Sequence, residues 1–277
     1  MRKTINIIIV LAGLILGCNN KPPIIIDSDL LKYEWKSKKS EYDYGRWFFI
    51  ENDTLMFQTL TYLDFVPFDH VVPYKISYDT LFITSEEDYP RRQRIFKYKI
   101  IEVDSVKLIL KQVFPPSWDT IIVLNKQIRT KKNDFKIERI DFYSGHCFGT
   151  CPVQSLSIGA DSVMYYNGYY HTKHEGLYKH KLSPDEFSGI QNRLNYIDRY
   201  DFELPPTTSP DVPHYRLFIK TPNDSIEISG TPDYPDDELG ILSEFIFYLR
   251  IKERFLNLTP LENEEFPFRY NSRWGGY

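Results

Sequence analysis

Short runs of β-branched and aromatic residues, separated by tight polar turns, fill the first half of the chain from residue 30 to residue 126. In one run Lys97 and Lys99 alternate with Phe96, Tyr98 and Ile100, as in a strand with one buried face. The pattern predicts strands over residues 46–50, 54–60, 71–77, 80–84, 95–103, 106–111 and 120–124. Seven or eight antiparallel strands of this length suit a small barrel or a curled meander, which leaves no long open edge.

An early tryptophan, Trp35 or Trp47, precedes these up-and-down hairpins. In this arrangement the segment resembles a lipocalin-like barrel. The resemblance concerns architecture, so it predicts a barrel for residues 30–126 and no particular ligand.

A polar stretch, residues 126–134, is followed by a segment of a different pattern. Residues 183–186 form a capping box with proline at the first helical position, and apolar residues continue it at helical spacing. A second helix is expected after the acidic residues 236–238. With hairpins before and between them, the order is β-β-β-α-β-β-α. We therefore expect a mainly β chain whose second domain, residues 135–255, is an α+β antiparallel sheet with two helices on one face. Residues 256–277 are expected to form a tail.

The N-terminus has the pattern of an export signal. Arg2 and Lys3 precede an apolar run, residues 5–16, that is shorter than the roughly 20 residues of a spanning helix. The next quartet, residues 15–18, reads Ile-Leu-Gly-Cys and resembles the lipobox of bacterial lipoproteins. Ile15 replaces the commoner leucine and Leu16 a small residue. An uncleaved N-terminal anchor and a conventionally secreted protein are the alternatives.

The lipobox resemblance implies a signal peptide over residues 1–17, cleavage before Cys18, and fatty acylation of Cys18. Two acyl chains would hold the protein stably on a membrane of the cell envelope, in the periplasm or on the cell surface. Residues 18–29 would be the lipidated tether. The membrane is thus a predicted partner.

Charge argues against nucleic acid as a partner. Loss of residues 1–17 removes two basic residues and no acid, leaving 32 basic against 38 acidic residues and a formal charge of about −6. Such binding needs a clustered basic face, and the short basic run in 126–132 is more simply a solvated linker.

One local motif stands out: residues 147–152 read Cys-Phe-Gly-Thr-Cys-Pro, between two predicted strands. With Gly168, Phe187 and residues 176–178, this segment resembles an uncharacterised bacterial domain family with a C-x-G-x-C-P signature that occurs in cell-envelope lipoproteins. The resemblance covers about residues 135–250. Because that family has no assigned activity, the resemblance implies fold and setting but no mechanism.

The chemistry of the cysteine pair has more than one interpretation. Three intervening residues, with Gly149 among them, can form a turn that brings the Cα atoms within the roughly 4.4–6.8 Å that a disulfide needs. After lipidation of Cys18, Cys147 and Cys151 remain as an even number in an oxidising compartment. A structural disulfide is therefore predicted. Its short loop would contribute only about 2 kcal/mol of stability.

Metal binding is an alternative for the same residues. The spacing also resembles the copper-binding loop of thioredoxin-like copper chaperones, which would make Cys147 and Cys151 thiolate ligands, with His146, His171 or His174 as a third. That family runs its motif into a helix, whereas residues 153–158 alternate as a strand. A redox-active pair is a further alternative, although no lysine or arginine is adjacent.

No motif specifies a reaction. The chain lacks a Gly-x-Ser-x-Gly elbow, a phosphate loop and a dinucleotide fingerprint, and no cofactor is predicted. Carboxylate pairs of hydrolases are defined in space, so an unrecognised hydrolase stays open. The sequence favours a non-catalytic cell-envelope binding module for a small molecule, glycan or protein partner. Metal handling or thiol redox chemistry at Cys147 and Cys151 is the alternative.

Overall fold

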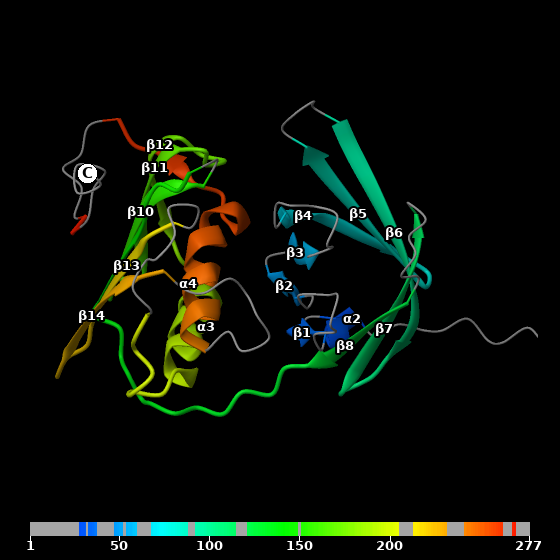
Figure 1. The fold of residues 1–277 in the computed structure, drawn as a ribbon, viewed down its shortest axis with the longest axis horizontal. Helices are drawn as coiled ribbons and strands as arrows, with labels where there is room; N and C mark the ends of the chain where they lie inside the picture. Colours follow the sequence, from blue (N-terminus) through cyan, green and yellow to red (C-terminus); the bar gives the residue numbers. More distant parts are fainter. Residues whose placement is uncertain are drawn as a thin grey trace, which may run out of the picture.

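The computed structural model describes residues 28–31, 33–37, 47–51, 54–59, 68–87, 92–114, 121–148, 151–204, 213–231, 241–262 and 268–269. The chain forms a β-barrel and a separate β-sheet, with two long helices between them (Figure 1). The predicted signal peptide and Cys18 lie outside the described residues, as does nearly all of the predicted tether.

The first half of the chain is a closed up-and-down antiparallel barrel, as predicted. Each strand pairs with the next, and the first pairs with the last through Trp35 and Lys126. Its strands are β1 (Trp35–Lys36), β2 (Trp47–Glu51), β3 (Thr54–Thr59), β4 (Phe68–Ser77), β5 (Thr80–Glu87), β6 (Arg92–Val103), β7 (Lys107–Phe114) and β8 (Ile121–Lys126). The seven predicted runs correspond to β2–β8, whereas β1 has two residues, too few to show a pattern.

The barrel core consists of inward side chains from all eight strands. Trp35, one of the two candidate tryptophans, is fully buried, and so is Leu31 from the short helix α2 (Ser28–Leu31) that precedes β1. Phe48, Tyr98 and Leu124 are at most 1% exposed and belong to the same cluster. Burial of large apolar side chains supplies the main stabilising term of such a barrel.

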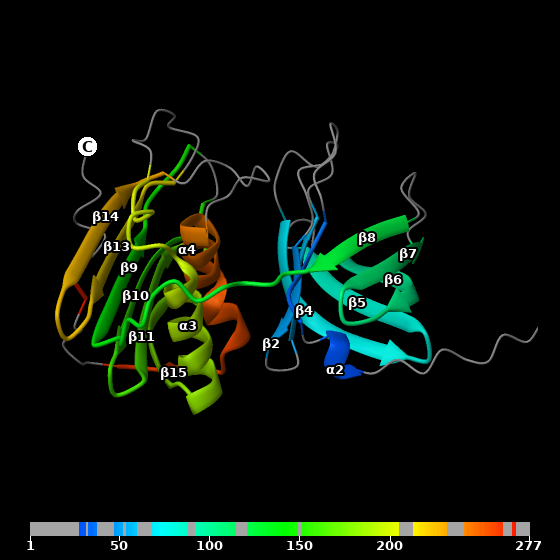
Figure 2. The same cartoon turned by 90° about the horizontal axis from the view of Figure 1, so that it is seen from below.

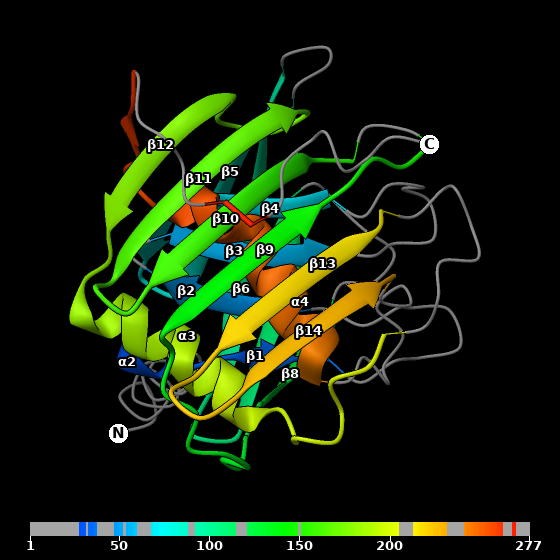
Figure 3. The ribbon, with the colours of Figure 1, turned by 90° about the vertical axis from the view of Figure 1, so that its left-hand side faces the viewer.

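The second half is a seven-stranded antiparallel sheet in the order β14-β13-β9-β10-β11-β12-β15 (Figure 3). Its strands are β9 (Arg139–Ser144), β10 (Val153–Gly159), β11 (Val163–Tyr170), β12 (Gly176–Lys181), β13 (Tyr215–Lys220), β14 (Ser225–Gly230) and β15 (Thr259–Pro260). Helices α3 (Pro184–Tyr196) and α4 (Ile241–Ile251) cover one face (Figure 2). This confirms the predicted α+β sheet with two helices on one face.

Helix α3 begins as the sequence predicts. Ser183 is its N-cap, the Ser183 hydroxyl accepts the Glu186 N–H at 3.2 Å, and the Glu186 carboxylate accepts the Ser183 N–H at 2.7 Å. Helix α4 is described from Ile241 onward, so the acidic first turn predicted at residues 236–238 lies outside the described residues. The 3-10 helix η1 (Lys252–Phe255) continues α4 directly.

Strand β12 was not among the predicted strands, so the order β-β-β-α-β-β-α is wrong at this point: four strands precede α3. β12 gives a weak pattern because Lys179 and Lys181 interrupt it and its residues are exposed or half-buried. β12 pairs with β11 on one side and with β15 on the other, and β15 lies in the segment that was expected to form a tail. Leu256, also in that segment, is only 6% exposed, and Leu261 N–H donates to the Leu177 carbonyl at 2.9 Å.

The segment joining the two halves, residues 127–137, has no regular secondary structure. Its Lys132 and Asn133 N–H groups both donate to the Asn195 carbonyl, at 2.7 and 3.1 Å, near the end of α3. The boundary predicted there stays a prediction. Within the described ranges, no helix combines the length and apolar composition that crossing a bilayer requires.

Candidate functional site: the cleft beside strand β12

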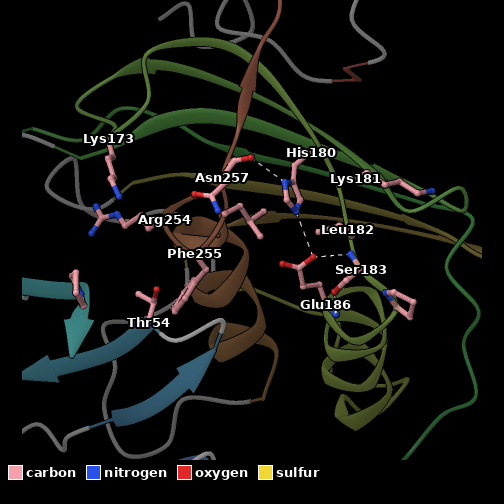
Figure 4. Close-up of a pocket in the computed structure, with 13 residues that line it drawn as sticks. Thr54, Lys173, His180, Lys181, Leu182, Ser183, Glu186, Arg254, Phe255 and Asn257 are labelled. Atoms are coloured by element: carbon pink, nitrogen blue, oxygen red, sulfur yellow. Dashed lines mark hydrogen bonds and ion pairs between the residues drawn. The ribbon is translucent and has the colours of Figure 1, made fainter. Parts of the chain in front are cut away.

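A cleft of about 840 Å³ lies where the barrel meets the second sheet (Figure 4). The barrel contributes Thr54 and Pro73, which are paired residues of β3 and β4. The rest of the lining comes from three places in the second half of the chain: the turn before β12 with the end of β12, the start of α3, and η1 with the residues after it. The cleft therefore depends on both halves for its walls.

Basic side chains dominate the charge of the cleft. Its lining includes Lys173, Lys181, Arg254 and His180 against a single carboxylate, Glu186. The Lys181 ammonium donates to the Asp161 carbonyl, and Figure 4 shows this side chain directed away from the other lining residues. Lys173 and Arg254 are the other two long basic side chains of the lining.

Lys173 and Arg254 come from different elements and point toward each other (Figure 4). In the described part of the chain, Lys173 has no ion-pair or hydrogen-bond partner, whereas Arg254 Nε lies 3.7 Å from Glu253 Oε1. The two positive charges repel each other, and a bound oxyanion between them would attract both. An ammonium and a guanidinium are also the side-chain donors best suited to carboxylate or phosphate oxygens.

A buried carboxylate supports this corner of the cleft. Glu253 is 1% exposed, and its Oε2 lies 2.8 Å from Nδ1 of His174, the residue after Lys173. Glu253 thus contacts both His174 and Arg254, one from the β11–β12 turn and one from η1. It fixes the turn that carries Lys173 relative to the helix that carries Arg254.

Gly168 allows the same turn to fold back over β11. A Cβ atom at this position would lie 2.0 Å from the His174 carbonyl oxygen and 2.3 Å from the Thr172 hydroxyl. Only glycine permits this approach of turn to strand. The glycine that formed part of the family resemblance therefore has a structural role next to the cleft.

The other end of the cleft is held by a second histidine. His180 Nδ1 lies 3.2 Å from the Asn257 carbonyl, and its Nε2 lies 3.4 Å from the Glu186 carboxylate. Glu186 also caps α3, so this acid is already engaged. Neither His174 nor His180 bonds to a serine, threonine or cysteine side chain in the described ranges. Each histidine is held in place by a carboxylate, and His180 also by a backbone carbonyl.

Aromatic contacts join the two halves next to the cleft. Phe49 of β2 points out of the barrel and is 3% exposed, with its ring centroid 5.6 Å from that of Phe255 and 6.2 Å from that of Tyr248. Met56 of β3 is fully buried and belongs to the core of the second sheet. Since Phe255 also lines the cleft, this packing fixes one of its walls.

Buried charges continue the same interface. Lys252, which is fully buried, donates to Glu51 of β2 and to the Tyr248 hydroxyl, the latter at 3.0 Å. Tyr248 donates in turn to Glu51 at 2.9 Å. Burial raises the pKa of Tyr248 to about 12. Burial lowers the pKa of Lys252, but Tyr248 and Glu51 outweigh it, so the net shift is upward and the ammonium stays charged.

A second group of charges lies nearer the start of α4. Glu34, next to β1, accepts from Arg193 of α3 at 3.1 Å and from Arg129 of the connecting segment at 2.6 Å. Glu244 of α4 accepts from Arg129 and from Lys36 of β1, the latter at 3.2 Å. The barrel, the connecting segment and both helices are thereby joined through paired charges.

The cysteine loop lies at the end of the second sheet that carries the β11–β12 turn. Cys147 and Cys151 form a disulfide with a Cα–Cα distance of 5.7 Å, as predicted. Tyr170 at the end of β11 pairs with Val153 of β10, and its ring centroid lies 5.5 Å from that of His146. The loop therefore borders the turn of Lys173, yet none of its residues lines the cleft.

The proposed metal ligands are dispersed. His146 is exposed beside Tyr170, His171 is exposed with a φ of 55°, and His174 is engaged by Glu253. Nowhere in the described ranges do three or more His, Cys, Asp or Glu side chains gather as a metal site would require. Joined in a disulfide, the two sulfurs are not thiolate ligands.

The fold and cleft define a class: a two-part β-rich protein in which an up-and-down barrel and a helix-covered sheet enclose a basic cleft. Residues 138–248 match the family model of a domain of unknown function, DUF6438. This agrees with the resemblance to an uncharacterised family over residues 135–250. No curated protein matches the chain.

No pattern in the sequence points to the cleft residues Lys173, Arg254 and Thr54. Each reads as an ordinary surface residue, and they are far apart in the chain. Two signals pointed to the turn that carries Lys173: Gly168, which formed part of the family resemblance, and His174, a candidate metal ligand. The pairing of Glu253 with His174 had no signal in the sequence.

Proposed function

We propose that this protein is a non-catalytic binding module of the bacterial cell envelope, anchored by lipid on Cys18, and that its ligand is a small molecule or glycan bearing an anionic group. The observation that carries the proposal is the convergence of Lys173 and Arg254 on a cleft of about 840 Å³. That volume lies within the range of small-molecule sites, roughly 300–1,000 Å³.

The arrangement of the cleft favours binding over chemistry. Its cations are supported by the buried carboxylate of Glu253, and its histidines are occupied by Glu253, Glu186 and a backbone carbonyl. Walls from two halves of the chain would let a ligand contact both. The inward side chains of the described barrel strands pack into a core, so the argument for a ligand site rests on the cleft and not on the barrel.

Titration with defined probes tests the binding proposal. Galacturonate, glucose 6-phosphate and inorganic phosphate carry the expected anionic groups, and glucose is the neutral control. We expect at least one anionic probe to raise the melting temperature and to bind in calorimetry. The double variant Lys173→Ala/Arg254→Ala should lose about tenfold or more in affinity, because both charged donors are gone.

A matched control is Lys136→Ala, since Lys136 is exposed on the connecting segment and outside the cleft. It removes one positive charge but should leave binding unchanged. Equal affinities for the double variant and the wild type would show that the anionic group is recognised elsewhere.

Acylation of Cys18 has a separate test. The wild-type protein expressed in bacteria should partition into detergent, whereas Cys18→Ala should not, because two acyl chains supply the membrane affinity. If both proteins remain membrane-bound to the same extent, residues 5–16 act as an ordinary anchor and the lipobox interpretation is wrong.

A further inference from the structure

The outer face of β6, β7 and β8 exposes an unusual number of apolar side chains. Six of them are between 39% and 59% exposed: Ile95, Ile101, Val113, Phe114, Ile121 and Val123. We call this set the barrel's apolar face. Soluble proteins rarely gather exposed large apolar residues over neighbouring strands unless the surface has a partner.

Strand β8 shows the pattern most clearly. Ile122 and Leu124 point into the barrel core, while Ile121 and Val123 point outward and are 59% and 44% exposed. A strand with one face in water normally alternates apolar and polar residues, whereas apolar residues on both sides are typical of a strand covered on both faces. β8 thus has the composition of a strand that is covered on both faces, although its outer side is exposed.

The apolar face lies on the side of the barrel away from the second sheet. The barrel contacts α3 and α4 through β1, β2 and β3, by way of Lys36, Phe49 and Met56. Figures 1 and 2 both place β6 and β7 on the opposite side. Within the described part of the chain, no element of the second half covers this face.

Lysines are interspersed among the apolar residues. Lys99 of β6 is directly opposite Lys111 of β7, which is in turn opposite Ile121 of β8. Lys97 lies 5.8 Å from the centroids of both the Phe82 and the Phe114 rings. Like charges on paired residues destabilise a sheet. Lys99 also lies 3.2 Å from Asp79, so the positive charge that this face offers to an anionic surface comes from Lys97 and Lys111.

The connection to the proposed anchor leads to the barrel. Cys18 is ten residues before Ser28, where α2 begins, so the tether spans at most about 35 Å. Leu31 of α2 is buried in the barrel core, which fixes the end of the tether to the barrel and not to the second sheet. The barrel is therefore the part of the protein held closest to the acylated residue.

We propose that the barrel's apolar face docks on the surface of the anchoring bilayer, with its isoleucine, valine and phenylalanine side chains at the headgroup boundary and Lys97 and Lys111 on anionic lipid headgroups. The orientation of the docked protein rests on the lipid anchor of the proposed function, but the affinity of the apolar face for the bilayer does not. Lysine is suited to this position because its stem lies on apolar surroundings while its ammonium reaches the headgroups.

Vesicle co-sedimentation of the mature chain carrying Cys18→Ser tests the proposal without the anchor. The probes are vesicles of phosphatidylcholine alone and of phosphatidylcholine with phosphatidylglycerol. We expect binding to the anionic vesicles, weakened by salt. Ile121→Thr/Val123→Thr should reduce binding by about tenfold, because two exposed aliphatic side chains are lost from the contact. Lys111→Gln should weaken binding to the anionic vesicles only.

The matched control Ile128→Thr/Tyr200→Thr removes two apolar side chains that are 84% and 87% exposed, outside the apolar face, and should leave binding unchanged. Val113→Thr/Phe114→Thr provides an independent variant should the β8 variant not fold. Vesicle binding that is absent in the parent, or equal in face and control variants, overturns the proposal. Self-association that the face variants abolish, without vesicle binding, would assign the face to a second copy of the chain instead. Failure of detergent partitioning at Cys18 would affect only the anchor.

Discussion

Helix α4 has two buried faces, one held by apolar packing and one held largely by paired charges and hydrogen bonds. Toward the sheet it presents Leu242, Phe245 and Leu249, all at most 3% exposed within one apolar core. Toward the barrel it presents Glu244 and Tyr248, whose partners are charged groups of β1, β2 and the connecting segment. Burial of apolar area holds the first face, while the second combines the packing of Tyr248 on Phe49 with the pairing of buried charges. The same helix thus forms a core and an interface.

The largest effect is expected on the sheet side. Leu249→Ala removes a fully buried side chain and leaves a cavity, so the free energy of unfolding should fall by about 3 kcal/mol. Urea unfolding followed by circular dichroism measures it. Ile128→Ala, at an 84% exposed position, is the control and should change stability little. A loss below about 1 kcal/mol for Leu249→Ala would mean that the sheet face collapses easily around the gap.

The barrel side should respond to loss of one charge. Glu244→Gln leaves Arg129 and Lys36 without their shared carboxylate, at a side chain only 9% exposed, so stability should fall by about 2 kcal/mol. Glu138→Gln breaks the exposed pair with Lys220 and should lose less than about 0.5 kcal/mol.

Glu244→Gln should also expose the connecting segment. Limited proteolysis of the wild type is expected to cut first within residues 126–134, the predicted domain boundary, and Glu244→Gln should speed that cut because Arg129 loses a partner. First cuts within residues 46–124 or 137–249 would argue against a division into two domains.

Loss of the disulfide should destabilise the protein no more than Glu244→Gln does. Cys147→Ser/Cys151→Ser opens a loop with a sequence separation of four, so the loss should be about 2 kcal/mol or less and the domain should stay folded. Alkylation of unreduced protein before mass spectrometry should find the two cysteines bridged and no copper or zinc retained. Two alkylatable thiols with stoichiometric metal would favour the metal-carrier alternative.

The smallest expected effect concerns one hydroxyl. Tyr248→Phe removes hydrogen bonds to Glu51 and Lys252, so stability at neutral pH should fall by about 1 kcal/mol. In the wild type, burial raises the pKa of Tyr248 from 10.0 to about 12. The folded pKa is above the unfolded one, so this contribution is complete below pH 10 and is lost between pH 10 and about 12. Stability of Tyr248→Phe should therefore fall less over that range; an identical slope would contradict the assignment.

The difference between the two faces also explains what the sequence could predict. Apolar alternation located strands β2–β8 and the capping box located α3, because those patterns arise from contacts that are local or repeat regularly. Glu244 and Lys252 read as solvent-facing positions, because a charge that is buried by a distant partner looks the same in sequence as an exposed one. The cleft could not be predicted for the same reason, because Lys173 and Arg254 meet only after the barrel and sheet are formed.

Native mass spectrometry of the protein extracted from its own cell envelope in mild detergent tests the central claim most directly, since the ligand need not be known beforehand. The wild type should carry a bound small molecule with an anionic group. Lys173→Ala/Arg254→Ala should lose it, and Lys136→Ala should retain it. The same bound mass on all three proteins, or none on any of them, would contradict the assignment of the cleft as the binding site.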